Sequence, residues 1–262
     1  MFAPETYDGD ARRSRFNKTA TPIISVVVAA RNEEPNIAGC LKALYSQSFS
    51  KEYEVIVVDN ASTDATIDIV KGFECRIVDE PIIGQLHAKH RGVREAKGFI
   101  IAVLDADCMP HSGWLDEIHE KLLNENYGTV VAITGLYDFG DQLPWWARAY
   151  IFLVHVVMQC TIRIMFQSFP YVVGGNVAFL RSAYFMGTGY NPFGGIAESE
   201  LGLAKSLGRF GKILMIPELT IKSHPRRFLK GPWHFFVEYK LFDYFLEYLL
   251  PSQKNWHCRG RN

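Results

Sequence analysis

The sequence predicts an α/β fold, with a mostly parallel sheet flanked by helices. Short β-branched runs alternate with segments of helical periodicity, which is how βαβ units appear in a sequence. Several apolar runs end abruptly in acidic residues, and 262 residues are enough for a large domain with a sizeable core. Such sheets bind ligands beyond the carboxyl ends of their strands, so the acidic run ends indicate where a site would lie.

Four strands and three helices are predicted in the first half of the chain. The strands are expected at residues 23–29, 55–59, 75–79 and 99–105. The helices are expected within residues 31–47, 60–73 and 85–98. Pro35 suits the first turn of the first helix, and Ser62, Thr63 or Asp64 suits the N-cap of the second. The alternation therefore predicts a Rossmann-like arrangement over this half.

Composition excludes some partners and compartments. Lys plus Arg and Asp plus Glu balance at 28 each, so no excess charge indicates binding to nucleic acid. The cysteines are odd in number and lack zinc-binding spacing, which favours reduced thiols and a cytoplasmic protein: Cys40, Cys75, Cys108, Cys160 and Cys258. Residues 1–21 are polar and lack the apolar core of a secretory signal, so we expect them to form a flexible leader.

Acidic side chains lie at or just beyond the ends of three of the predicted strands, and the first strand runs on to Glu33. Asp59 ends the second strand, and Asp105 and Asp107 end the fourth. If Asp105 and Asp107 both stay extended, they point the same way about 6.6 Å apart, and at an effective dielectric of about 20 their repulsion is about 2.5 kcal/mol. A divalent cation that completes its shell with phosphate oxygens would offset this repulsion. The alternative for the Asp-Ala-Asp motif alone is a solvated turn.

Three stretches carry a resemblance to a known family. SVVVAARNEEPNIAGCLKALYSQ, VIVVDNASTDAT and AKHRGVREAKGFIIAVLDADC resemble the nucleotide-sugar-binding half of the family 2 glycosyltransferases, which have the GT-A fold. The likeness resumes at VVGGNVAFLRSAY and AESELGLAKSLGRFGKI and covers well over half the chain. It implies a GT-A catalytic domain at residues 22–225, with the nucleotide-sugar-binding half at 22–108 and the acceptor half at 109–225.

The resemblance implies a donor site at the strand ends. Ala29, Arg31 and Glu33 would line the nucleoside pocket, and Asp59 would hydrogen-bond the base. Asp105 would lie near the ribose and the donor sugar. The apolar run before Asp105 would then be a buried strand that carries its aspartates into the site.

Metal and phosphate contacts complete the implied donor site. Asp107 would hold the Mn2+ or Mg2+ that bridges the diphosphate, and His224 would complete the metal shell, since a neutral imidazole is a plausible ligand. Lys89 stands where relatives often carry Arg and could reach phosphate. Arg226 and Arg227 could meet the diphosphate, because a guanidinium fork matches phosphate oxygens. The alternative for His224 is a structural role, and the alternative for Arg226 and Arg227 is an exposed basic turn.

Two motifs form the implied acceptor side. Gly174, Gly175 and Asn176 resemble the family's loop beside the donor sugar and acceptor, where glycine permits close backbone approach; the alternative is a plain turn. Glu198 stands at the position of the proposed general base of the family, and Glu200 at that of a later acid. The residue before Glu198 is an alanine where the family usually has Glu. Alternatively, both glutamates merely stabilise a helix N-terminus.

Two amphipathic segments lie outside the minimal fold. An inserted helix is expected at about residues 144–168, and a C-terminal helix and tail at 226–262. Each places a polar stripe on an otherwise apolar helix, and the apolar stretch of the first is too short to span a bilayer. Aromatic side chains with flanking Arg suit helices that lie on a membrane, so we expect peripheral membrane contact. The alternative is packing on the catalytic core or on a second subunit.

Together these features predict a metal-dependent, inverting glycosyltransferase. The expected reaction moves a sugar from a nucleoside-diphosphate sugar, with UDP as the expected nucleotide, to an acceptor hydroxyl that Glu198 deprotonates. A glycan or lipid-linked acceptor and a place at the inner face of the membrane would follow from the amphipathic segments. Two alternatives stay open: a haloacid-dehalogenase-like phosphatase that uses the paired aspartates, and a nucleotide-sugar binder without catalysis.

Overall fold

The computed structural model describes residues 21–123, 129–140, 172–191 and 196–224, together with Leu143, Trp145 and Leu153. Apart from Thr21, Trp145 and Leu153, the expected leader (1–21), inserted helix (about 144–168) and C-terminal segment (226–262) lie outside the described residues. The predicted domain boundaries therefore stay predictions, and the described part of the chain ends at residue 224.

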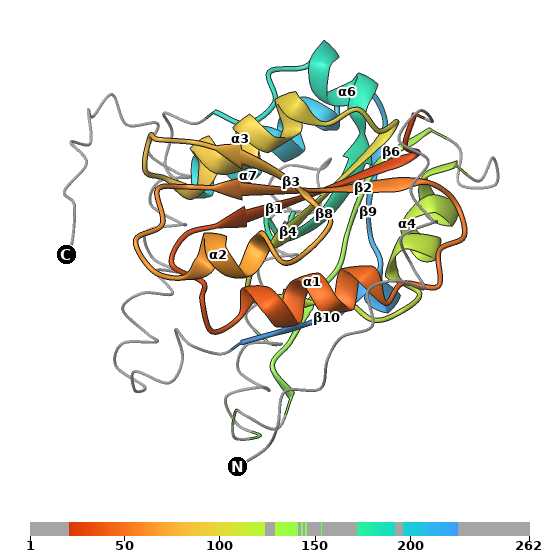
Figure 1. Cartoon of the computed structure of the whole chain (residues 1–262). Helices are drawn as coiled ribbons and strands as arrows, with labels where there is room; N and C mark the ends of the chain where they lie inside the picture. The colour runs from red at the N-terminus through yellow and green to blue at the C-terminus, as the bar shows by residue number, and fades with distance from the viewer. Residues whose placement is uncertain are drawn as a thin grey trace.

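Within these residues, a seven-stranded sheet forms the centre of the molecule, in the order β3-β2-β1-β4-β8-β6-β9 (Figure 1). Its strands are β1 (Ile24–Ala30), β2 (Tyr53–Asp59), β3 (Arg76–Asp79), β4 (Ile100–Asp105), β6 (Val130–Thr134), β8 (Asn176–Leu180) and β9 (Lys212–Met215). Strand β8 runs antiparallel to β4 and β6, and the remaining pairs are parallel. The mostly parallel sheet predicted from the sequence is confirmed.

Helices cover both faces of this sheet (Figure 1). One face carries α1 (Ile37–Tyr45), α2 (Thr66–Val70) and α4 (Trp114–Leu123). The opposite face carries α3 (Gln85–Glu95), α6 (Arg181–Met186) and α7 (Ile196–Leu207). Within the stretches that the structure describes, no helix combines the length and the apolar composition needed to cross a bilayer.

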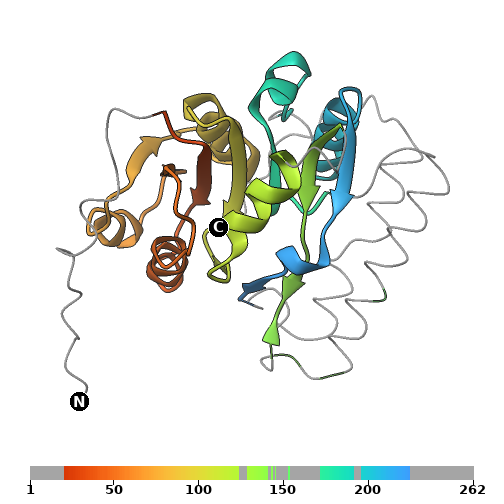
Figure 2. The same ribbon diagram turned by 90° about the vertical axis from the view of Figure 1, so that its right-hand side faces the viewer.

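A small second sheet lies on the side of the main sheet that carries α1 and α4 (Figure 1, Figure 2). Its strands are β5 (Cys108–Met109), β7 (Tyr137–Asp138) and β10 (Ile221–Ser223), and a short 3-10 helix (Pro217–Leu219) leads into β10. Strand β10 pairs with β5 antiparallel and with β7 parallel. This pairing brings the end of the described chain back to the residues that follow β4.

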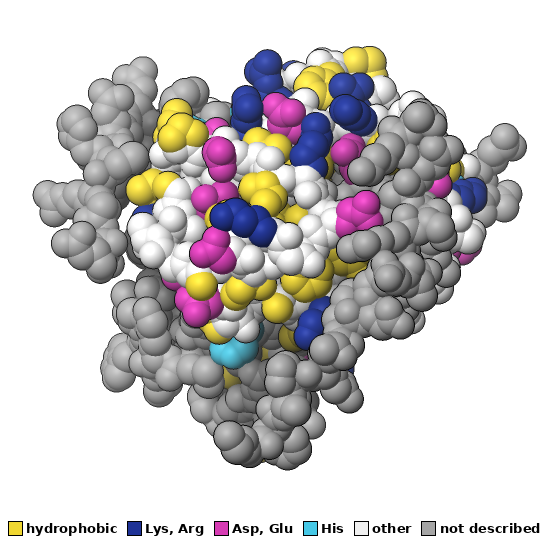
Figure 3. Space-filling view, in the orientation of Figure 1, with side chains coloured by type: hydrophobic (Ala, Val, Ile, Leu, Met, Phe, Trp, Pro, Cys, Tyr) yellow, Lys and Arg dark blue, Asp and Glu magenta, His cyan; other side chains and the backbone are white. Residues whose placement is uncertain are grey.

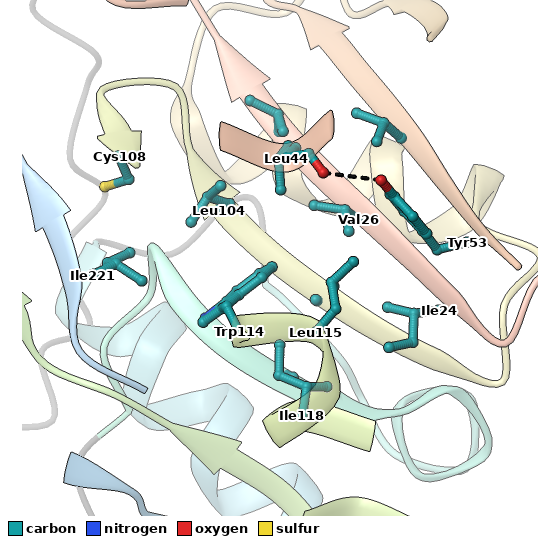
Figure 4. Packing of buried hydrophobic residues seen from close by; sticks show 14 of the residues in the cluster. Ile24, Val26, Leu44, Tyr53, Leu104, Cys108, Trp114, Leu115, Ile118 and Ile221 are labelled. Atoms are coloured by element: carbon teal, nitrogen blue, oxygen red, sulfur yellow. Dashed lines mark hydrogen bonds between the residues drawn. The ribbon is translucent and has the colours of Figure 1, made fainter. Parts of the chain in front are cut away.

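The core consists of two layers, one on each face of the main sheet. Along β1, Ile24 and Val28 pack into the layer that includes α1 and α4, whereas Val27 packs into the layer that includes α3. Burial on both faces explains the nearly continuous apolar runs in the sequence, and each such side chain stabilises the fold by about 2 kcal/mol. The hydroxyl of Tyr53 donates to the carbonyl oxygen of Leu44 at 2.9 Å, which ties β2 to α1 (Figure 4).

Two predicted helix starts were wrong. Pro35 lies ahead of α1, which begins at Ile37, because the carbonyl oxygen of Glu33 accepts the N–H groups of the next turn. The predicted N-caps of the second helix were Ser62, Thr63 and Asp64. Helix α2 instead begins at Thr66, without a side-chain cap, and the Asp64 carboxylate accepts the N–H of Thr66 at 3.0 Å. Asp64 thus satisfies the N–H group of the first residue of α2 from one position before the N-cap residue, Ala65.

Candidate active site

The register of the main sheet gathers the predicted site residues at one edge. Ala29 of β1 pairs with Asp105 of β4, and Ala30 pairs with Asp59 of β2. Acidic side chains also gather on the side of the molecule where these strands end, over α2 and the adjoining loops (Figure 3). The convergence that the strand ends predicted is therefore present in the structure.

Asp105 contacts three polar side chains at this edge. Its Oδ1 atom accepts a hydrogen bond from Nε2 of Gln85 at 2.9 Å and forms an ion pair with Nζ of Lys89 at 2.9 Å. Its Oδ2 atom accepts a hydrogen bond from the hydroxyl of Tyr137 at 3.4 Å. Lys89, which the resemblance directs to phosphate, is paired with a carboxylate instead. The ammonium group of Lys89 therefore offsets much of the negative charge of Asp105. The sequence had predicted that a bound cation or open water would do so.

Asp107 does not continue the strand as the simple spacing argument assumed. Strand β4 ends at Asp105, the chain turns, and β5 begins at Cys108, so the separation expected for two extended residues does not apply. The Sγ atom of Cys108 donates to Oδ1 of Asp107 at 3.4 Å. The turn separates the two carboxylates into different surroundings, one facing Lys89 and the other facing the small sheet.

The small sheet brings His224 to Asp107. Ser223 lies opposite Cys108 across the β5–β10 pair, and the N–H of His224 donates to the carbonyl oxygen of Asp107 at 3.2 Å. The Nδ1 atom of the His224 ring is buried and has no hydrogen-bond partner among the described residues. Because a buried polar atom normally has a partner, this nitrogen fits a ligand at the site. Arg226 and Arg227, which follow it, lie outside the described residues.

These side chains fit a divalent metal that shares its shell with a substrate. Asp107 supplies a hard carboxylate and His224 an imidazole nitrogen, both common ligands of Mn2+. In the described part of the chain, no three His, Cys, Asp or Glu side chains lie close enough to hold a metal by themselves. A metal at Asp107 and His224 would therefore take its remaining ligands from outside the described residues, and phosphate oxygens of a substrate suit this role.

Two buried thiols lie beneath the paired aspartates. Burial, and then the charges of Asp107 and Asp105, raise the pKa of the Cys40 thiol far above its usual value. Burial and the same two carboxylates also raise the pKa of Cys108. Both sulfurs therefore stay protonated and act as small core groups, and Cys108 can donate its proton to Asp107. With Cys75, these are the free cysteines of the described chain, in agreement with the predicted reduced thiols.

The glycine loop packs directly against two carboxylates. A Cβ atom on Gly174 would lie 2.1 Å from Oε1 of Glu200, and one on Gly175 would lie 2.1 Å from Oδ2 of Asp105. A side chain at either position would have to displace the neighbouring carboxylate, so glycine permits this close packing. Lys89 donates to the carbonyl oxygen of Gly174 at 2.9 Å. The loop is therefore more than the plain turn that the sequence also allowed.

Asn176 follows the two glycines of the loop, and its side chain is bonded within the protein. Its Nδ2 atom donates to the carbonyl oxygens of Leu219 at 2.7 Å and Leu136 at 3.3 Å. Its Oδ1 atom accepts from Nε1 of Trp114 at 3.2 Å, and only 1% of the residue is exposed. The amide is thus occupied by contacts within the protein, so Asn176 anchors the glycine loop and does not face a sugar.

Tyr137 belongs to this cluster and was missed in the sequence. Burial, and then the charge of Asp105, hold the pKa of Tyr137 well above its usual value, and Glu200 and Asp107 contribute in the same direction. The hydroxyl therefore stays protonated and donates to Asp105. Tyr137 lies in a two-residue strand with no motif around it. Pairing within the small sheet brings its hydroxyl to Asp105. Gln85, the first residue of α3, was also missed.

One face of α7 points to the glycine loop. Leu203, Ala204 and Leu207 are buried, and Glu200 precedes them at helical spacing, with its carboxylate against Gly174. Position 198 lies two residues earlier, which is about 200° around the helix axis. The backbone of Glu198 is part of α7, and its side chain lies outside the described part of the chain.

The two loops that follow β1 and β2 are joined by hydrogen bonds. Oδ1 of Asn32 accepts the N–H of Thr63 at 2.8 Å, and the N–H of Glu33 donates to Oγ1 of Thr66 at 2.8 Å. Asn32 has a φ of 53° and Ala61 a φ of 56°, a left-handed conformation that costs about 1 kcal/mol for a residue with a side chain. The joined loops therefore form a wall at the carboxyl ends of β1 and β2, and the bonds between them fix its strained backbone conformation.

The residues expected to form a nucleoside pocket line this wall in different ways. Arg31 is exposed and Ala29 is half-buried. Glu33 is only 8% exposed, and its carboxylate accepts a hydrogen bond from Nδ2 of Asn36 at 2.8 Å. One oxygen of Asp59 accepts a backbone N–H three residues on, at 3.1 Å. Asp59 and Arg31 thus present polar groups at the edge, whereas Glu33 is largely used within the protein.

A family comparison identifies this arrangement. The model of glycosyl transferase family 2 matches residues 25–185, which include β1, the paired aspartates and the glycine loop. The chain belongs to glycosyltransferase family 2. Neither this match nor the similar folds support the phosphatase alternative.

Family 2 relatives are similar over less than half of this chain. Glycosyltransferase AglE of Haloferax volcanii is 38% identical over 121 residues, which are 44% of this chain and 38% of the relative. The Methanococcus voltae protein named dolichyl N-acetyl-alpha-D-glucosaminyl phosphate 3-beta-D-2,3-diacetamido-2,3-dideoxy-beta-D-glucuronosyltransferase is 31% identical over 113 residues, 39% of this chain and 35% of the relative. The matched part thus spans little more than a third of either relative.

Solved structures of similar glycosyltransferases confirm the fold. The mannosyltransferase PcManGT of Pyrobaculum calidifontis, in complex with GDP-Man and Mn2+, superposes with a TM-score of 0.67 at 22% identity, over 90% of this chain and 66% of that one. Glucosyl-3-phosphoglycerate synthase of Mycobacterium tuberculosis, in complex with Mn2+, UDP and phosphoglyceric acid, superposes with a TM-score of 0.60 at 22% identity. The superposition covers 86% of this chain and 78% of that one. At this identity the likeness shows the fold alone, and the predicted GT-A fold is confirmed.

Proposed function

We propose that this chain is a metal-dependent glycosyltransferase that moves a sugar from a nucleoside-diphosphate sugar to an acceptor hydroxyl. The observation that carries the proposal is that the small sheet holds the backbone of His224 against Asp107 at the strand edge of a family 2 domain, while the buried Nδ1 atom of the His224 ring has no hydrogen-bond partner among the described residues. The similar structures from Pyrobaculum and Mycobacterium, which hold Mn2+ together with a nucleotide or nucleotide sugar, support it.

The donor would lie across the carboxyl ends of β1, β2 and β4. Asp59 keeps one oxygen in its own turn and can offer the other to an N–H group of the base, as uracil and guanine both present. We expect UDP, because uridine nucleotides are the ligands of the Mycobacterium complexes, although the Pyrobaculum complex holds GDP-Man. Asp105, held by Lys89 and Tyr137, would face the ribose and sugar.

Asp107 and His224 would hold Mn2+ or Mg2+. When bound, the ion supplies positive charge that stabilises the departing diphosphate. The protein's own residues orient the acceptor and remove its proton. A carboxylate of α7 takes the proton as the acceptor oxygen attacks the anomeric carbon, and the bond from that carbon to the diphosphate breaks with its electron pair leaving on the diphosphate. Attack from the opposite side inverts the anomeric centre.

Two carboxylates of α7 are candidates for the base. The resemblance assigns the role to Glu198, and the described contacts place Glu200 beside the glycine loop. Both lie on the same helix, so the proposed reaction does not depend on which one acts. Their positions on the helix distinguish them, and a pair of variants separates the two assignments.

We propose a lipid-linked or other glycan acceptor, with this chain at the inner face of a membrane. Two facts support it: the amphipathic pattern of residues 144–168 and 226–262, and the name of the Methanococcus relative, which specifies a dolichyl-linked sugar phosphate. The test offers the identified donor with a polyprenyl-linked acceptor in vesicles or with a soluble sugar. Transfer to the soluble sugar alone, without sedimentation of the protein on vesicles, would refute this acceptor.

The proposed function is tested by thermal unfolding with UDP, GDP, TDP and CDP, each with and without Mn2+. A ligand that binds only the native state at about 100 times its Kd stabilises by about 2.7 kcal/mol, which raises Tm by about 5–10 °C. We expect one nucleotide to give a manganese-dependent shift. Asp107→Ala and His224→Ala should abolish it, whereas Asp68→Ala, at an exposed position on α2, should not.

The same measurement can refute the proposal. If no nucleotide shifts the unfolding of the wild-type protein, the donor site is absent. If a nucleotide binds equally well with and without Mn2+ and with Asp107→Ala, the metal part is wrong while a nucleotide site remains. Turnover of the matching nucleotide sugar then separates an enzyme from a binder without catalysis.

A further inference from the structure

Lys89 lies within α3 and is buried, with 3% of its side chain exposed. Its Nζ atom forms an ion pair with Oδ1 of Asp105 at 2.9 Å and donates to the carbonyl oxygen of Gly174, also at 2.9 Å. An ammonium group has three N–H donors and no acceptor, so two of its donors are used here. A single buried cation therefore joins the end of β4 to the glycine loop.

The two groups that Lys89 holds also contact each other. The N–H of Asp105 donates to the carbonyl oxygen of Gly175 at 3.4 Å, and a Cβ atom on Gly175 would lie 2.1 Å from Oδ2 of Asp105. Gln85 donates to Oδ1 at 2.9 Å, and Tyr137 donates to Oδ2 at 3.4 Å. Contacts from α3, β7 and the glycine loop therefore leave the carboxylate one orientation.

We infer that Lys89 is a positioning residue, which fixes the Asp105 carboxylate against the glycine loop, and that it does not bind phosphate. The inference rests on the proposed function for the roles of the two groups that Lys89 holds. Moving Nζ away to a phosphate would break both contacts and would take the ammonium charge from Asp105, in surroundings that the negative charges of Glu200 and Asp107 also reach. Breaking a buried ion pair is strongly unfavourable.

Hydrogen–deuterium exchange tests the positioning without any substrate. Lys89→Met removes the ammonium and keeps the aliphatic stem, and Lys42→Met, at an exposed position on α1, is the matched control. In Lys89→Met, the amides of Asp105 and residues 173–176 should exchange at least about tenfold faster, because the link that restrains them is lost. Exchange equal to that of the wild type would overturn the inference. Lys89→Gln, which keeps N–H donors without the charge, serves if the methionine variant does not fold.

Kinetics with the donor found in the nucleotide panel give the second readout. For Lys89→Met we expect kcat to fall about 100-fold and the donor KM to change less than about threefold, as for a misplaced site with intact phosphate contacts. A phosphate ligand would do the opposite: affinity for the nucleoside diphosphate would fall more than about tenfold while affinity for the nucleoside stayed constant, which would overturn the inference. If the wild type binds no nucleotide, the proposed function fails, and the exchange experiment still decides the role of Lys89.

Discussion

The space beside Gly175 is already filled by two functional side chains. A Cβ atom there would lie 2.1 Å from Oδ2 of Asp105 and 2.4 Å from the hydroxyl oxygen of Tyr137. Real Cβ atoms do not approach other atoms so closely, so an added methyl group must displace the carboxylate or the loop. Because Asp105 is fixed from several sides, the displacement cannot be absorbed by one flexible side chain.

Gly175→Ala should therefore disable the site more than it destabilises the fold. We expect a loss of about 1–3 kcal/mol in the free energy of unfolding, as for overpacking, and a loss of at least about 100-fold in kcat/KM for transfer. Urea unfolding and steady-state transfer rates measure the two effects.

Gly202→Ala is the matched control for this prediction. Gly202 lies in α7, and a Cβ atom there would meet nothing within 4 Å. Alanine in a helix interior is more favourable than glycine by about 1 kcal/mol, so this variant should be at least as stable as the wild type and fully active. Equal loss of activity in both glycine variants would contradict the assignment of Gly175 to the site.

Residue types at strand ends could be read from the sequence, but side-chain directions could not. Asp59 and Asp105 lie at the edge that the alternating pattern predicted. Lys89 was expected to reach phosphate and Asn176 to lie in a loop beside the donor sugar, yet the Lys89 ammonium is paired with a carboxylate and the Asn176 amide is bonded within the protein. A motif gives the position along the chain, whereas the direction depends on neighbours that come from distant segments.

At the scale of elements, α7 separates two glutamates that the sequence places almost side by side. Residues two apart on a helix do not share a face, because each residue turns the chain by about 100°. Glu200 shares the buried face with Leu203, Ala204 and Leu207, and its carboxylate lies against Gly174. The helix therefore favours Glu200 over Glu198 as the carboxylate that meets an acceptor beside the glycine loop.

Glu200→Gln should accordingly lower kcat by about 100-fold or more, because a general base contributes about that factor, while nucleotide binding with Mn2+ persists. Glu198→Gln is the matched variant on the same helix and should keep most of the activity. The measurement is kcat for both variants alongside their nucleotide-induced Tm shifts. The reverse order of effects would return the role of base to Glu198, as the family resemblance implied.

The small sheet is the element that completes the site. Strand β10 places His224 at Asp107, and β7 places Tyr137 at Asp105. These strands have two or three residues each, too short for a periodic pattern in the sequence. Their formation depends on pairing between segments far apart in the chain, so sequence reasoning reached His224 only through the family resemblance and did not reach Tyr137.

At the scale of the whole molecule, two histidines make stability depend on pH. Burial, and then the charge of Arg94, lower the pKa of His90, whose Nδ1 atom lies 3.0 Å from the hydroxyl oxygen of Tyr184. Burial, and then the charge of Lys51, lower the pKa of His119. Each folded pKa is below the unfolded value of about 6.5, so the unfolded chain binds more protons in this range.

The free energy of unfolding should therefore fall as the pH is lowered through about 6.5 towards the folded pKa values, and be nearly constant above pH 7.5 or so. Urea unfolding at pH 7.5 and pH 5.5 measures the difference. A His90→Asn/His119→Asn double variant should show a smaller difference than the wild type. If both proteins lose the same stability over this interval, other groups set the pH dependence.

The sequence by itself determined the α/β class, the parallel strands and the edge where the acids gather. These features depend on local periodicity and on the rule that parallel strands end at the same side, both of which are properties of the chain's pattern. The tertiary structure decided what each acid does: Lys89 and Tyr137 fix Asp105, and the small sheet gives Asp107 a histidine. Such assignments depend on contacts between distant segments, and local pattern does not encode them.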